Sequence, residues 1–321
     1  EEPRAIAESV RQGVARSLAG GTVLVGDIAG CVKGQPSALA GMALIGQPIN
    51  AVSFVEFFSL NEKWQSVVHQ GVIQQGLLAK AAAASDEGGC VMAGISPHAP
   101  YSVMPEAFAC LLDPADPMGR LMAQGHVPIM MHVAESLSER QFIHDGSGPI
   151  RALVEKLGLF TPALQQRVGH GLTPLQHVAR AIDARPGAEG ARLIGVHLND
   201  VQDVDLEQGC VMQHAAYCPR SSSYFNHDLD MGPHRYREII EGGSLLALGT
   251  DSIVNLDTPD RISVLDEGRR LYRQARPLNA CTLLDAMTRA GEIAISGGLG
   301  DHAVAAGDAA WPGEGARRTF G

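Results

Sequence analysis

Short apolar runs rich in Val, Ile and Leu alternate with longer amphipathic segments along the chain. Parallel strands that are buried on both faces have this appearance, and the helices that connect them carry apolar residues three or four positions apart. The apolar runs predict strands over residues 22–28, 49–57, 91–96, 127–133, 192–197, 209–218 and 244–251. Helices are predicted between them, including residues 62–84, 150–157, 173–183 and 261–274.

The repeated order of strand and helix predicts an α/β fold, a (β/α)8 TIM-type barrel from which one strand is missing. A helix, EEPRAIAESV, is predicted before the first strand, so we expect the missing strand to precede Glu1. Residues 1–290 would form the barrel, strands two to eight, and the Gly- and Ala-rich residues 291–321 a loose C-terminal tail. The alternative is an open doubly wound sheet, whose site would lie where the strand order reverses.

Composition narrows the class of partner. The chain has 321 residues, 45% of them hydrophobic, and a formal net charge of −10. Phosphate backbones are bound by clustered Lys and Arg, so we expect a small-molecule substrate and no nucleic acid. The six cysteines form no C-x-x-C pair and no apolar run approaches the length of a membrane helix, about 20 residues. We therefore expect reduced cysteines, a cytoplasmic location and no membrane partner.

Polar residues terminate several of the predicted strands. VPIMMHVAES ends in His132 with Glu135 three residues later, LIGVHLNDV ends in His197, LLALGTDS ends in Asp251, and VMAGISPHAPYS passes into His98. In a parallel barrel the site lies at the carboxyl ends of the strands. Neutral His and ionised Asp are good ligands for zinc or iron, so these side chains could converge on one ion.

Each of these residues also has a structural interpretation. A lone His at a strand end is more often hydrogen bonded than a ligand, and His98 could be a turn residue. Asp251 could cap the following helix, and Glu139 could be a solvated helix charge. Motifs for P-loops, serine hydrolases and dinucleotide-binding folds are absent from the sequence.

The order of these motifs along the chain is more informative than any single motif. Together they resemble the amidohydrolase superfamily, in particular its chlorohydrolase and deaminase branch. SLAGGTVLVGDI resembles the second strand of that family, SPHAPYSV the fourth, MHVAES the fifth, GVHLNDV the sixth, HAAYCPRSS the seventh and LALGTDSIVN the eighth. The resemblance covers roughly residues 10–295.

The resemblance implies a role for each matched residue. His132 is implied as a metal ligand, Glu135 as the general acid/base, and Asp251 as the residue that completes the metal shell. His197 would contact the metal-bound water or the substrate and is included in the metal site. His98 and Ser252 are expected to bind substrate. One divalent metal is implied, with zinc favoured over iron.

The sequence departs from the family at its start. Relatives carry H-x-H at the end of the first strand, and none of the twelve histidines here forms that pair. We expect that the sequence starts after this strand; the alternative is a damaged or non-catalytic relative. The small β-domain that relatives build from both termini is also largely missing, and residues 291–321 would be its remnant.

The function implied is hydrolytic deamination of an aminated heterocycle, a purine or adenosine-like compound, a pyrimidine or a triazine, by metal-activated water. One alternative is a cyclic amide hydrolase, although these enzymes often use a carboxylated Lys and no Lys ends a predicted strand here. A second alternative is a non-catalytic binding or scaffold protein. Assembly into a homo-oligomer is left open.

Overall fold

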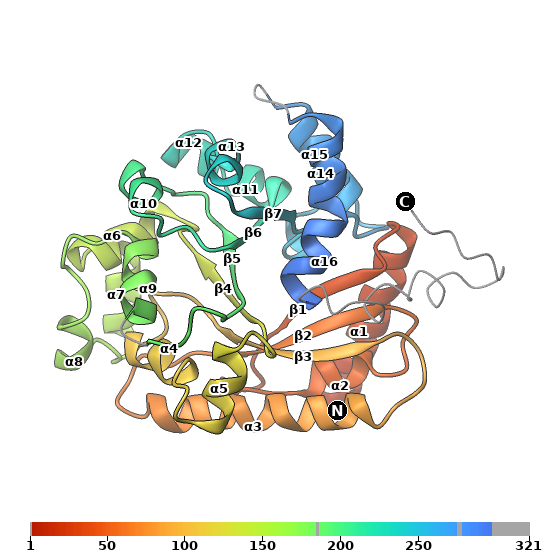
Figure 1. Ribbon diagram of the computed structural model, residues 1–321, viewed down its shortest axis with the longest axis horizontal. Helices are drawn as coiled ribbons and strands as arrows, with labels where there is room; N and C mark the ends of the chain where they lie inside the picture. Colours follow the sequence, from red (N-terminus) through yellow and green to blue (C-terminus); the bar gives the residue numbers. More distant parts are fainter. Residues whose placement is uncertain (1, 184–185, 275–277, 297–321) are drawn as a thin grey trace.

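Seven parallel strands form one sheet in the order of the sequence. The computed structural model describes residues 2–183, 186–274 and 278–296. The sheet has the order β1-β2-β3-β4-β5-β6-β7 and curls into a half-barrel (Figure 1). Its strands are β1 Leu24–Ala29, β2 Asn50–Phe57, β3 Val91–Pro97, β4 Ile129–Val133, β5 Leu193–His197, β6 His214–Tyr217 and β7 Leu245–Leu248. All seven predicted strands are confirmed, and the sequential order contradicts the doubly wound alternative, in which the order would reverse.

Helices connect successive strands and cover the outer, convex face of the sheet (Figure 1). The predicted helices are present, with the first turn of several beginning later than the periodicity suggests. The helical elements are α1 Glu2–Ala19, α2 Leu39–Leu44, α3 Trp64–Ala83, α4 Pro105–Leu111, α5 Pro117–Ala123, α6 Leu137–Asp145, α7 Gly148–Lys156, α8 Pro162–Gln165, α9 Pro174–Asp183, α10 Asp203–Glu207, α11 Pro219–Tyr224, α12 His227–Met231, α13 Tyr236–Glu241, the 3₁₀ helix η1 Ile253–Asn255, α14 Val264–Tyr272, α15 Ala280–Met287 and α16 Arg289–Ser296.

Two predicted strands are shorter than expected. The run over residues 209–218 becomes a strand only from His214, because Gly209 (φ +65°) belongs to the turn that ends α10. The run over residues 244–251 ends its pairing at Leu248, which leaves Asp251 in the loop beyond β7. Apolar runs of this kind include the loop residues next to a strand, so periodicity overestimates strand length.

The side chains of β4 point alternately to the two faces of the sheet and so contribute to two separate layers of the core. Ile129, Met131 and Val133 pack against the outer helices, whereas Met130 lies in a smaller cluster on the inner face. Successive side chains of a strand point to opposite faces, so His132 shares the inner face with Met130. The same alternation puts Val52, Phe54 and then Glu56 of β2 on the inner face.

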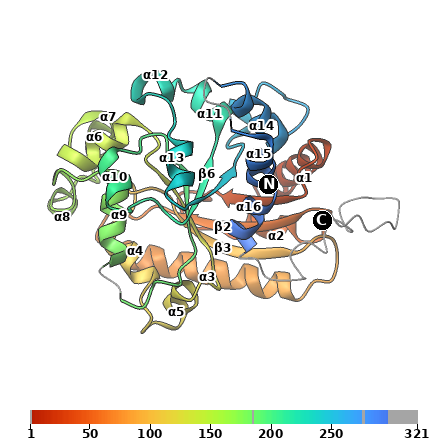
Figure 2. The ribbon, with the colours of Figure 1, turned by 45° about the horizontal axis from the view of Figure 1, so that its top comes forward.

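Helix α16 lies against the inner cluster, close to β1 (Figures 1 and 2). Its residues Ala294 and Ile295 are buried in that cluster, and a Cβ added at Gly26 of β1 would lie 3.2 Å from Ile295 Cγ2. Arg192 Nη1 donates a hydrogen bond to the carbonyl oxygen of Ile295 at 3.1 Å. Residues 291–296, which the sequence predicts as the start of a C-terminal tail or a remnant of the small β-domain, lie in α16, where Ala294 and Ile295 fill space inside the curved sheet. Residues 297–321 lie outside the described residues.

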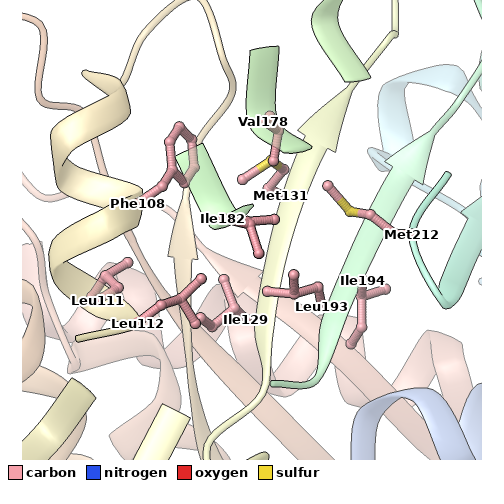
Figure 3. A pocket seen from close by; sticks show the side chains of 10 residues that line it. All are labelled: Phe108, Leu111, Leu112, Ile129, Met131, Val178, Ile182, Leu193, Ile194 and Met212. Atoms are coloured by element: carbon pink, nitrogen blue, oxygen red, sulfur yellow. The ribbon is translucent and has the colours of Figure 1, made fainter. Parts of the chain in front are cut away.

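A small cavity lies between the sheet and the outer helices (Figure 3). It has a volume of about 10 Å³, room for no more than one water molecule, and its lining is almost entirely apolar, with Phe108 of α4, Val178 of α9 and Met131 of β4 around it. Because no group with acid, base or metal-binding chemistry lines it, we regard it as a packing gap.

All six cysteines are free thiols in the structure, as the sequence predicts. None of the helices in the described part of the chain has the length and apolar character needed to cross a membrane.

Candidate active site

Three histidines gather at the carboxyl end of the sheet. His98 directly follows β3, His132 is next to last in β4, and His197 is the last residue of β5. The His132 ring centroid lies 5.1 Å from that of His98 and 5.4 Å from that of His197. Neighbouring parallel strands end at the same mouth, and this is why residues 34 and 65 positions apart along the chain come together.

Two carboxylates lie beside these rings. Glu135 Oε1 is 3.6 Å from His197 Nε2. Burial raises the pKa of Glu135, while the neighbouring His132 opposes this shift and Asp251 adds to it. Burial lowers the pKa of His197 to about 4, and the carboxylate of Asp251 opposes that shift. The two carboxylates and two imidazoles therefore lie within electrostatic reach of one another.

The backbone is strained at these strand ends. Among the described residues that are not glycine, six have positive φ, and four of them lie here: Ala134 (+52°), His197 (+77°), Leu198 (+53°) and Asp251 (+55°). Alternation after Val196 would direct the next side chain outward, and the left-handed backbone at His197 breaks that alternation. Conformations of this kind cost about 1–3 kcal/mol each and cluster at functional sites.

Buried hydrogen bonds hold the strained loop after β4. Glu139 is fully buried and accepts hydrogen bonds from the backbone N–H groups of Ala134 (3.1 Å) and Glu135 (2.8 Å). Asn199 Nδ2 donates to the carbonyl oxygen of Glu135 at 3.0 Å. The interpretation of Glu139 as a solvated helix charge is thus wrong, because the loop folds back over the first turn of α6 and encloses it.

The protonated nitrogen of His132 can be assigned from its partner. Its Nδ1 lies 3.0 Å from the carbonyl oxygen of His98, and a carbonyl oxygen only accepts hydrogen bonds. Nδ1 therefore carries the proton, and Nε2 keeps a lone pair. Metal-binding histidines have this arrangement, in which the second ring nitrogen donates to a carbonyl or carboxylate.

Asp251 is oriented by side chains from α11 and η1. Its Oδ2 accepts hydrogen bonds from Ser221 Oγ at 2.6 Å and Asn255 Nδ2 at 2.9 Å. It does not cap η1; Ser252 does so, since its Oγ accepts from the N–H of Val254. Asp251 is exposed and Ser252 lies beside it at the mouth. The substrate-binding role of Ser252 stays a prediction.

Two further polar residues face this mouth and were not identified from the sequence. Glu56 is the next-to-last residue of β2 and lies on the inner face, and one of its carboxylate oxygens lies within 4.8 Å of ring nitrogens of both His98 and His132. His227 of α12 has a buried Nε2 without a hydrogen-bond partner in the described part of the chain, and Glu135 raises its pKa against the effect of burial. A charged residue inside the apolar run SFVEFF was a usable signal for Glu56. His227 ends no strand, and no pattern marks it.

The family assignment follows from comparison with known proteins. A model described as the Amidohydrolase family matches residues 1–310, so this chain belongs to the amidohydrolase family. An aminodeoxyfutalosine deaminase of Deinococcus radiodurans is 27% identical over 218 residues, which are 64% of this chain and 45% of that protein. The chain thus spans less than half the length of that curated relative.

Solved structures show the same fold. The aminofutalosine deaminase of Helicobacter pylori has a TM-score of 0.66 and 20% identity, with 90% of this chain and 65% of that chain covered. An adenosine deaminase of Xanthomonas campestris with bound zinc has a TM-score of 0.59 and 18% identity, with 92% and 57% covered. The amidohydrolase structures are TIM barrels, so the predicted α/β barrel class is confirmed.

Proposed function

We propose that this chain forms most of the catalytic barrel of a hydrolytic deaminase that acts on an aminated heterocycle, with an adenosine-like nucleoside as the favoured substrate. The observation that carries the proposal is the meeting of His132, Glu135 and His197 at one end of the sheet, with Glu135 Oε1 3.6 Å from His197 Nε2. The names of the relatives, an aminodeoxyfutalosine deaminase and an adenosine deaminase, support the reaction and the substrate class.

A divalent metal fits the donor set. The lone pair on His132 Nε2 and the carboxylate of Asp251 would hold it, with His197 beside them. Imidazole and carboxylate donors suit zinc, and the zinc in the Xanthomonas relative supports that choice over iron. When bound, such an ion supplies the means of lowering the pKa of a water molecule toward about 7.

Glu135 performs the proton transfers in this proposal. It accepts a proton from the attacking water and delivers it to the ring nitrogen, then takes the proton of the hydroxyl added to the carbon and gives it to the departing amine. The carbon–oxygen bond forms, the carbon–nitrogen bond breaks, and ammonia leaves. His197 and Asp251 orient the water, and the hydrogen bonds from Ser221 and Asn255 keep the Asp251 carboxylate in place. The raised pKa of Glu135 suits a group that must both accept and return a proton.

An ammonia-release screen tests this proposal. Zinc-loaded protein that carries this chain should release ammonia from at least one of adenosine, adenine, guanine, cytosine and an aminotriazine, with zinc content measured on the same preparation. Absence of release from all of them by metal-loaded protein would sink the proposal and favour a non-catalytic binding protein.

The 321-residue chain by itself should bind zinc weakly. His132, His197 and Asp251 supply two or three ligands, and a shell reduced from four loses much of its affinity. Elemental analysis after dialysis measures the zinc content, with free zinc buffered in the micromolar range. Near-stoichiometric zinc would contradict this prediction and would require further ligands, for which Glu56 and His98 are the nearest candidates.

A further inference from the structure

Glu56 is a buried acid without a partner. It is 7% exposed, no hydrogen bond or ion pair of its carboxylate is found within residues 2–183, 186–274 and 278–296, and burial raises its pKa to about 7. An isolated buried charge is costly unless donors surround it. The position beside Gly30 is unfilled next to this carboxylate, since a Cβ added at Gly30 would meet Glu56 Oε2 at 3.8 Å and no other described atom within 4 Å. The carboxylate is thus available to a ligand that enters from the mouth.

His98 offers a second acceptor next to it. Ser102 Oγ donates to the carbonyl oxygen of Ala99 at 3.1 Å, so this hydroxyl must accept from His98 Nδ1, 2.6 Å away. The proton is therefore on Nδ1, and His98 Nε2 keeps its lone pair. The ring is held by Phe58, whose centroid lies 4.3 Å away. One carboxylate and one imidazole nitrogen, both acceptors, thus lie near each other, and no described residue donates a hydrogen bond to either.

We propose that Glu56, beside His98, binds a pair of neighbouring hydrogen-bond donors of the substrate and so selects substrates that present such a pair. This inference rests on the proposed function. Two parts of an adenosine-like substrate present that chemistry: the vicinal hydroxyl groups of the ribose, and the two N–H bonds of the amino group on the heterocycle. A hydrogen bond to a charged acceptor is stronger than one between neutral groups, so the carboxylate gives most of the selectivity.

The same atoms could instead bind a metal ion, because Glu56, His98 and His132 offer ligand atoms within 4.8 Å of one another. His132 Nε2 has only one lone pair, however, and the proposed function assigns it to the ion that Asp251 shares. A direct measurement separates the two: a Glu56 substitution lowers the zinc content if Glu56 is a ligand, and leaves it unchanged if Glu56 binds substrate.

The experiment compares zinc-loaded wild type with Glu56→Gln on adenosine, 2′,3′-dideoxyadenosine and adenine. Gln keeps the size of the side chain and removes its charge. We expect kcat/KM for adenosine to fall about 10- to 150-fold, mainly through KM, with zinc content and melting temperature unchanged. Glu62→Gln, an exposed acid in the loop after β2, is the matched control and should leave kcat/KM within about twofold.

The two analogues identify the donors. If Glu56 binds the ribose, wild type loses activity on the dideoxy compound and Glu56→Gln loses little more, because the interaction is already absent. If Glu56 binds the heterocycle, the loss in Glu56→Gln is similar for all three substrates. If Glu56→Gln keeps kcat/KM within about twofold of wild type on every substrate, or if it loses its zinc, the proposed role of Glu56 is wrong and the proposed function still stands. Wild type that turns over none of them would overturn the proposed function as well.

Discussion

Replacement of Glu135 by Gln should leave a folded, zinc-loaded protein that has lost most of its turnover. An amide cannot accept the proton of the attacking water. A positioned general acid/base contributes about 10²- to 10⁴-fold in rate, and a residue that serves both transfers should lie at or above the upper end. Ammonia release, zinc content and melting temperature measured on one preparation test this prediction.

The fold should tolerate this change, since Gln preserves the volume of Glu135 and the bond from Asn199 reaches its backbone oxygen, which the substitution leaves in place. Glu207→Gln, an exposed acid at the end of α10, is the control and should keep full activity. More than about a tenth of normal activity in Glu135→Gln would remove Glu135 from the mechanism, since proton transfer should cost more. An inactive variant that had lost its zinc would make the role of Glu135 structural.

Replacement of Arg220 by Ala should destabilise the protein by about 3–5 kcal/mol, the range for removal of one partner of a buried ion pair. Arg220 is 7% exposed, and its Nε donates to Glu267 Oε1 at 2.6 Å. Its Nη1 donates to Asp257 at 3.1 Å and to Thr258 at 2.8 Å. Without the guanidinium group, the fully buried Glu267 keeps only the backbone N–H of residue 220 as a donor in the described structure. Urea unfolding measures the free energy of unfolding.

Arg289→Ala is the matched control, because its pair with Asp285 is exposed and joins the end of α15 to the start of α16. Exposed pairs contribute about 0.2–1 kcal/mol. Addition of Glu267→Gln to Arg220→Ala should recover part of the loss, since it removes the unpaired charge. A loss below about 1 kcal/mol in Arg220→Ala, or no recovery in the double variant, would contradict the buried-charge explanation.

The catalytic assignment also depends on this ion pair. Arg220 is the second residue of α11 and precedes Ser221, which donates to Asp251. A weakened Arg220–Glu267 contact should therefore loosen the orientation of Asp251 as well as the packing of α11 on α14.

Local pattern was sufficient to predict the strands and their order. When apolar runs that are buried on both faces alternate with amphipathic helices, few folds other than a parallel sheet with crossover helices can bury all of them. The polar ends of those runs, His98, His132 and His197, were identifiable for the same reason, because a polar residue that ends a buried strand lies at the mouth of the barrel. Their roles as ligand or substrate contact remain predictions.

Only the tertiary structure decided which of the remaining polar residues belong to the site. Glu139 has the sequence context of a surface helix charge, yet the loop after β4 folds over it and buries it completely. Glu56 reaches the mouth because every second side chain of β2 points inward as far as the carboxyl end of the strand. Residues 291–296 form a helix because the concave face of the sheet provides apolar surface that covers them. Sequence pattern reports the environment that a residue prefers, whereas burial depends on which distant segments come to lie on it. That is why the strands could be predicted from the sequence, whereas the side chains that surround the candidate catalytic residues could be identified only from the fold.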